Sequence, residues 1–269
     1  MTLKKQSRPI IRPFGKLYYL INHEYRLLQK QILIICLLEF VIGQVLFIAT
    51  LAPYNREEKL LFAPFEQIVA QSGQSLLTII SVGFALLFIG LGVHQQFTPG
   101  RSIYRLYQLE SSPAILYGAK LIAAATGLML VLLTQLVSAI AAWFLYYQSA
   151  AADLIPGSLQ LAFLRSGHLL LLAPVDAWHV TFQAVLLILA AAWVVSSVLE
   201  LHKPGQSAFS GLALMAAVLL ATAVLLRMVY GSLDEFKPAA RVFQLLLAAA
   251  LCGLVMLRGH HLLAERTAC

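Results

Sequence analysis

Long apolar stretches, each about as long as the hydrocarbon core of a bilayer is thick, recur six times along this 269-residue chain. A helix of about 20 apolar residues crosses that core, so each stretch predicts one transmembrane helix. We place the six spans at residues 32–51, 76–93, 121–147, 180–199, 211–229 and 242–257. The sequence therefore predicts an all-α membrane protein with six transmembrane helices, and an even number of spans puts both termini on one side.

The segment before the first span is amphipathic. Its apolar residues recur at helical spacing, and its polar residues occupy the other side, which is typical of a helix that lies in the membrane interface. The apolar side holds Phe14, Leu17, Tyr18, Ile21, Tyr25 and Leu28, and the polar side holds Lys16, Asn22, His23, Arg26 and Lys30. The first 30 residues have no apolar region that ends in a cleavage site, so the first span is expected to act as the insertion signal.

These patterns divide the chain into three parts. Residues 1–30 are expected to form a cytoplasmic tail and the interfacial helix, 31–258 the six-helix transmembrane domain, and 259–269 a cytoplasmic C-terminal tail. The loop 149–179 contains two apolar runs, 159–164 and 169–173, which are too short to span. We expect these runs to dip into the outer leaflet or to cap the helices.

Composition and charge fit a membrane protein and give its orientation. Hydrophobic residues make up 60% of the chain and charged residues 12%, and the mean hydropathy is +0.82. Thirteen of the 19 lysines and arginines fall on the side that holds the termini, so the positive-inside rule makes both termini cytoplasmic. The net charge of +7 is then explained by anionic lipid beside the spans, without nucleic acid.

No enzyme signature is present. The sequence lacks HExxH, GxSxG and the Walker A motif, and its three cysteines have no metal-ligand or disulfide spacing. His260 and His261 are adjacent, so they point to different faces of a helix and make a poor chelate. We therefore expect a chain with no catalytic site, no metal and no cofactor of its own.

Glu39 is the most unusual residue in a span, because an ionised group inside a bilayer costs a few kcal/mol. One interpretation places Glu39 on the wall of a substrate path, with Gln44 further along the same helix as a second polar group. The other makes Glu39 a structural hydrogen-bond partner for an amide such as Gln135 or Gln183.

The connector between the second and third spans, residues 98–120, is polar and basic. Pro99 and Gly100 are expected to end the second helix, and the pattern after them predicts a short amphipathic helix. Its apolar side holds Ile103, Leu106, Tyr107 and Leu109, and its polar side holds Arg101, Arg105 and Gln108. After Pro113 the chain turns back into the membrane through Lys120.

At the connector, residues 105–121 read RLYQLESSPAILYGAKL, and this stretch resembles the type-2 ABC transporter permeases. The Gly-Lys-Leu that opens the third span in that family is similar to Gly118, Lys120 and Leu121 here. The resemblance implies a cytoplasmic coupling helix that docks into a separate ATPase subunit, and that subunit would bind ATP and Mg. The coupling residues it implies are Arg101, Arg105, Leu106, Tyr107, Leu109 and Glu110.

The expected function is that of a permease subunit of a bacterial ABC exporter in the cytoplasmic membrane. It would pair with a second copy or a related permease and with two cytoplasmic ATPase subunits. An apolar path with few charges would suit a lipid-like molecule, an amphipathic peptide or a drug. The alternative is a non-transporting scaffold or the membrane anchor of a larger complex.

Overall fold

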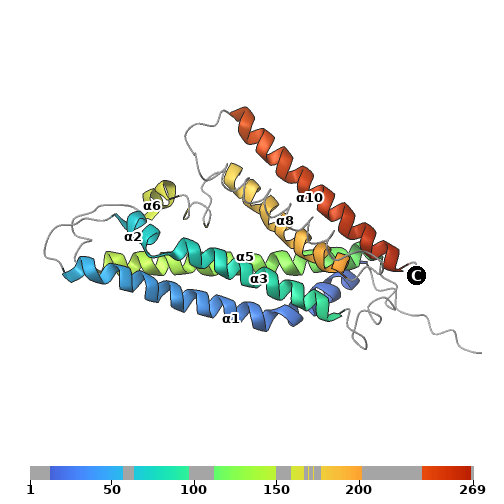
Figure 1. Cartoon of the computed structure of the whole chain (residues 1–269), viewed down its shortest axis with the longest axis horizontal. Helices are drawn as coiled ribbons and strands as arrows, with labels where there is room; N and C mark the ends of the chain where they lie inside the picture. Colours follow the sequence, from blue (N-terminus) through green and yellow to red (C-terminus); the bar gives the residue numbers. More distant parts are fainter. Residues whose placement is uncertain are drawn as a thin grey trace, which may run out of the picture.

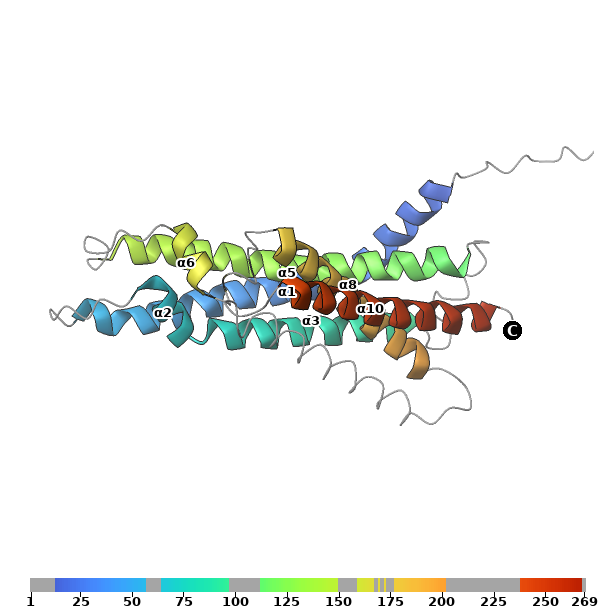
Figure 2. The ribbon, with the colours of Figure 1, turned by 90° about the horizontal axis from the view of Figure 1, so that it is seen from above.

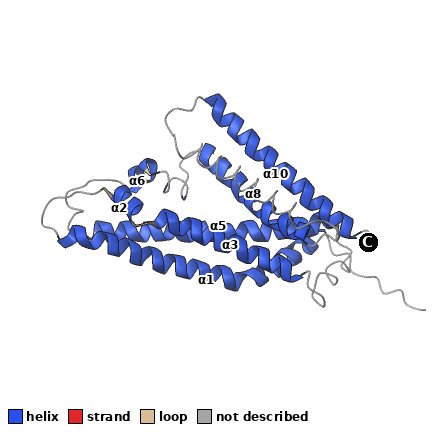
Figure 3. Cartoon of the chain, in the orientation of Figure 1, coloured by secondary structure: helices blue, strands red, loops and turns tan. Residues whose placement is uncertain are grey.

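The computed structural model describes residues 13–56, 64–96, 112–149, 159–166, 169, 172, 177–201 and 238–267. All of the secondary structure in that part of the chain is helical, which confirms the all-α class there (Figure 3). The helices are α1 (Pro13–Arg56), α2 (Phe65–Gln71), α3 (Gln74–Gln96), α5 (Pro113–Tyr147), α6 (Leu159–Arg165), α8 (Ala177–Leu201) and α10 (Pro238–Thr267).

Four of these helices, α1, α3, α5 and α8, are long and apolar enough to cross a membrane. They coincide with the first four predicted spans. The fifth predicted span, 211–229, lies outside the described residues, and the sixth lies within α10, which is 30 residues long and continues to Thr267. The count of six spans therefore stays a prediction, while a multi-pass membrane protein fits the four long helices.

The outward faces of the long helices are apolar. Large side chains such as Leu37 on α1, Ile79 on α3 and Leu257 on α10 are exposed, and many more accompany them. A surface of this extent is rare on a water-soluble monomer but is what lipid tails require. The mean hydropathy of the chain is high because apolar residues occupy these outward faces as well as the core.

Figures 1 and 2 show α1, α3 and α5 side by side, with α8 and α10 as a second pair. In Figure 1 the two groups converge at the end where α8 and α10 finish and separate toward the other end. The burial of α8 follows this arrangement, because every residue from Val194 to Glu200, at its end, is buried. A helix that is covered all round lies in a core, so the end of α8 lies in a core at the convergence point.

Helices α1 and α5 run in the same direction with a constant offset of 96 residues. Glu24 bonds Lys120 and Glu39 bonds Gln135, so two contacts 15 residues apart on each helix have the same offset. At 1.5 Å per residue they are about 22 Å apart along α5. The buried positions between them match in the same way: Glu24, Leu28, Ile32, Ile35, Glu39 and Gly43 on α1, and Lys120, Ala124, Leu128, Val131, Gln135 and Ala139 on α5.

The first part of α1 leaves the bundle. Figure 2 shows the start of this helix, in the darkest blue, at an angle to the remainder. Among residues 17–27 only Leu20 and Glu24 are buried, so this part touches the bundle through few side chains. It corresponds to the predicted interfacial helix, which is thus continuous with the first span. Its position in the membrane interface stays a prediction.

Short helices cap the end opposite the convergence point. Phe65 of α2 packs against Phe47, Trp143 and Tyr146, with ring centroids 5.7, 5.1 and 5.6 Å away. Arg165 of α6 pairs with Glu66 of α2 at 3.5 Å. Of the two expectations for the apolar run 159–164, the structure favours a cap, because α6 packs on α2 rather than crossing the bundle.

The close approach of α10 gives a test of this packing. A methyl group added at Gly259 would overlap the side chains of Ser196 and Tyr117, whereas one at Gly253 meets no described atom within 4 Å. We expect Gly259→Ala to lower the free energy of unfolding by about 1–3 kcal/mol and Gly253→Ala, its matched control in the same helix, to leave it nearly unchanged. Thermal unfolding of the detergent-purified variants measures both. Equal stability of the two variants would contradict the close contact of α10 with α5 and α8.

Candidate functional site

The structure describes the two helices that the connector joins. Helix α3 ends at Gln96, and α5 begins at Pro113 after Ser112, whose side chain caps the helix by accepting a hydrogen bond from the Ile115 N–H at 3.4 Å. Proline in the first turn and serine at the N-cap favour a helix start at this point. The predicted coupling residues Arg101, Arg105, Leu106, Tyr107, Leu109 and Glu110 lie outside the described residues.

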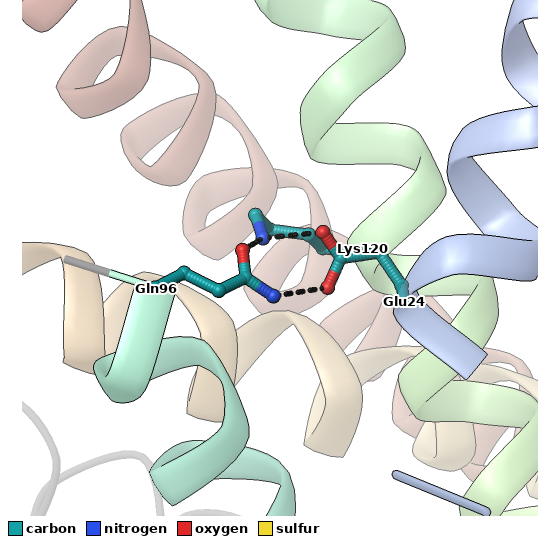
Figure 4. Close-up of polar contacts among 3 residues, drawn as sticks. All are labelled: Glu24, Gln96 and Lys120. Carbon is teal, nitrogen blue, oxygen red and sulfur yellow. Dashed lines mark hydrogen bonds and ion pairs between the residues drawn. The ribbon is translucent and has the colours of Figure 1, made fainter. Parts of the chain in front are cut away.

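Three polar side chains meet where the connector leaves and re-enters the bundle, and we call them the Glu24 cluster: Glu24 of α1, Gln96 of α3 and Lys120 of α5 (Figure 4). Lys120 Nζ donates to Glu24 Oε1 at 2.7 Å, and Gln96 Nε2 donates to Glu24 Oε2 at 2.6 Å. Lys120 Nζ also donates to Gln96 Oε1. The three hydrogen bonds close a ring in which each side chain bonds both of the others.

The Glu24 cluster is enclosed and electrically neutral. Glu24, Gln96 and Lys120 are only 3%, 3% and 2% exposed. All three side-chain oxygens of the ring accept a bond, so the positive and the negative charge are both compensated without water. Separating such a pair leaves an unpaired charge in a medium of low dielectric constant, which typically destabilises a protein by about 3–5 kcal/mol.

The first turns of α5 also contact the other helix pair. The Tyr117 hydroxyl lies 2.9 Å from Ser196 Oγ on α8, and Ser196 Oγ donates to the Val255 carbonyl on α10 at 3.2 Å. One turn further along α8, Glu200 forms an ion pair with Arg258 of α10. The start of α5, where the connector ends, therefore contacts α1 and α3 through Lys120 and α8 through Tyr117.

Glu39, the predicted path residue, lies further along α1 and is 1% exposed. Gln135 Nε2 donates to its Oε1 at 2.7 Å, which is the contact that the structural interpretation names. Its Oε2 has no hydrogen-bond partner among the described residues. Gln44 Nε2 donates to Ser138 O and Oγ, both at 2.8 Å. Glu39 and Gln44 thus face α5, apart from the Glu24 cluster, and their role in a path stays a prediction.

Metal ligands do not gather in the described part of the chain. No group of three His, Cys, Asp or Glu side chains there is close enough to hold an ion. The described cysteines, Cys36 and Cys252, are free thiols. The polar contacts described above are ion pairs and hydrogen bonds of amide and hydroxyl groups.

Two members of the Glu24 cluster, Glu24 and Gln96, were not predicted from the sequence, and Lys120 entered only through the charge count and the family motif. A signal was present, because Glu24 falls between Ile21 and Leu28 on the apolar side of the amphipathic segment. Gln96 likewise follows Ile89 and Val93 on the buried face of α3. Polar residues on an apolar face point to partners, but the pattern does not identify them.

Comparison of the chain with protein-family models, with curated proteins and with solved structures finds no match. The resemblance to type-2 ABC permeases therefore rests on the connector pattern and the layout of the chain. The function proposed below is based on the geometry of the chain's own residues.

Neutralising Lys120 should be strongly destabilising. Lys120→Met keeps the length of the side chain but leaves the Glu24 carboxylate buried without a cation, so we expect a loss of about 3 kcal/mol in the free energy of unfolding. Adding Glu24→Gln removes the second charge and should recover most of that loss. Reversible unfolding in mixed detergent measures both variants. A double variant as unstable as Lys120→Met alone would mean that the charges are not coupled.

Replacing Glu39 separates its two interpretations. Glu39→Gln retains an acceptor for Gln135 and removes the ionisable group, so a structural residue should tolerate it with folding and transport unchanged. Gln135→Leu, the control, removes the donor itself and should weaken helix association by about 0.6 kcal/mol. Normal folding of Glu39→Gln with altered transport, or with altered pH dependence of transport, would assign Glu39 to a path.

Proposed function

We propose that this chain is the membrane-spanning permease subunit of an ATP-driven ABC transporter, an exporter in a bacterial cytoplasmic membrane. It works as a dimer with a second copy or a related permease. Separate cytoplasmic ATPase subunits bind ATP and Mg and dock on the connector. The substrate is an amphipathic or apolar molecule such as a peptide, a lipid-like compound or a drug.

The observation that carries the proposal is the Glu24 cluster at the two ends of the connector. Replacing a buried ion pair by apolar residues is often neutral or stabilising, so stability alone is a weak reason to keep one. An ion pair does fix geometry, because its hydrogen bonds form in few arrangements. A connector that receives force from a partner needs such a fixed base, whereas an ordinary loop does not.

The arrangement of the helices supports the same function. The α1–α3–α5 group and the α8–α10 pair converge near the start of α5 and separate toward the capped end. Two groups joined at one end are suited to alternating access, in which helix bundles rock about a junction. Closure of the ATPase pair would bring the connectors together and tilt one group against the other.

Truncating the connector is the test of this proposal. If Leu106 and Tyr107 fill a cleft on the ATPase, Leu106→Ala with Tyr107→Ala should weaken ATPase binding by about 2 kcal/mol or more, roughly thirtyfold. The variant should still insert and dimerise. Co-purification of the ATPase and substrate-stimulated hydrolysis measure the loss, and the permease without its partner should not hydrolyse ATP.

A matched control lies on α6, which caps the opposite end of the bundle. Leu161 and Leu164 are exposed on α6, and Leu161→Ala with Leu164→Ala should leave ATPase binding unchanged. Wild-type assembly and turnover in the connector variant, or ATP hydrolysis by the isolated chain, would reject the permease assignment and favour the scaffold.

A further inference from the structure

We propose that the Glu24 cluster is a clamp that makes the first part of α1, residues 13–27, move as one unit with the connector. Glu24, Gln96 and Lys120 are then positioning residues for energy coupling. The mechanical part, that residues 13–27 move with the connector, concerns this chain alone. The coupling part rests on the proposed function.

The first part of α1 is attached to the bundle through few side chains. Its buried side chains among residues 17–27 are Leu20 and Glu24, which lie one turn apart on one face. Leu20 packs in the apolar core that includes Leu116 and Tyr117 of α5. Glu24 supplies the polar attachment. Without it, Leu20 and the partly buried Leu17 and Ile21, which pack against the same core, remain to hold this part of the helix.

Gln96 and Lys120, the other two residues of the cluster, lie on either side of the connector in the chain. Gln96 is the last residue of α3, two positions before the connector begins, and Lys120 is the final residue of the connector. Both bond the same carboxylate, one on each oxygen. A displacement of either connector end therefore pulls on Glu24 directly.

Helix α1 connects the Glu24 cluster to the opposite end of the bundle. Beyond Glu24, α1 continues unbroken to Arg56, and its contacts with α5 keep the offset of 96 residues up to Glu39 and Gln135. At the capped end Phe47 of α1 meets the aromatic cluster around Phe65. Motion that enters at the clamp thus reaches α1 and α5 as a pair, in the same register as far as Glu39 and Gln135.

A second ion pair near the same end serves as the control. The Glu200 side chain is 4% exposed, as the Glu24 side chain is, and pairs with Arg258, but Arg258 is 44% exposed. This pair joins α8 to α10. Breaking it perturbs a nearby ionic contact without opening the clamp.

The mechanical part is tested by a distance between spin labels at Tyr18, exposed on the first part of α1, and Leu91, exposed on α3. The three native cysteines are replaced by serine, and double electron–electron resonance is recorded in nanodiscs. We expect one narrow distance distribution in the otherwise wild-type chain and in Arg258→Met. It should broaden or shift by several ångströms in Lys120→Met.

Gln96→Leu opens the ring without leaving an unpaired charge, so this variant remains informative if Lys120→Met does not fold. We expect it to broaden or shift the distance distribution between the two labels in the same direction as Lys120→Met. Distributions in Gln96→Leu or in folded Lys120→Met that match the wild-type one would overturn the clamp.

The coupling part is tested by reconstitution with the ATPase. We expect Lys120→Met to retain ATPase binding but to lose substrate stimulation about tenfold, with Arg258→Met unaffected. Full stimulation in Lys120→Met would refute transmission through the clamp. Failure of the wild-type chain to bind any ATPase would refute the proposed function and leave the distance measurement to decide on the clamp.

Discussion

The buried pairing of Glu24 with Lys120 is the constraint on which the rest of this structure depends. Both side chains are at most 4% exposed, and they lie 2.7 Å apart, so neither can move away without leaving an uncompensated charge. The pair fixes the start of α5 against α1. The same offset of 96 residues recurs at Glu39 and Gln135. The Glu24–Lys120 pair therefore also brings the matching buried faces of the two helices into register.

Helix α5 thereby becomes the common partner of the other long helices. Lys120 contacts α1 and α3, and Tyr117, one turn earlier, contacts Ser196 of α8. The connector returns into these turns, so a force applied to it enters at the junction of the two helix groups. Small residues such as Gly259 allow the backbones to approach there, as is common where helices pack in membranes. The proposed role as a permease uses this junction as its pivot.

The helical class and the four spans that coincide with long helices were predictable because hydropathy is a local property that one window of residues contains. Gln135, the donor to Glu39, was one of two candidate amides, with Gln183, since a lone carboxyl in a span needs a donor and few amides lie in the other spans. The Glu24 cluster was not predicted, because Glu24 and Lys120 lie in segments expected at the membrane interface, where a charged residue is ordinary and does not call for a buried partner. The coupling residues of the connector and the fifth span lie outside the described part, so they stay predictions.

The most direct measurement of the central claim, that α1 and α5 lie parallel with an offset of 96 residues, is disulfide cross-linking in native membranes. Cysteines at Ile32 and Leu128 follow that offset and should cross-link rapidly on oxidation. Cysteines at Ile32 and Gln135 are displaced by two turns, about 10 Å along α5, and should not. Cross-linking of the displaced pair, or its absence in the matched pair, would contradict the register that the Glu24–Lys120 pair establishes.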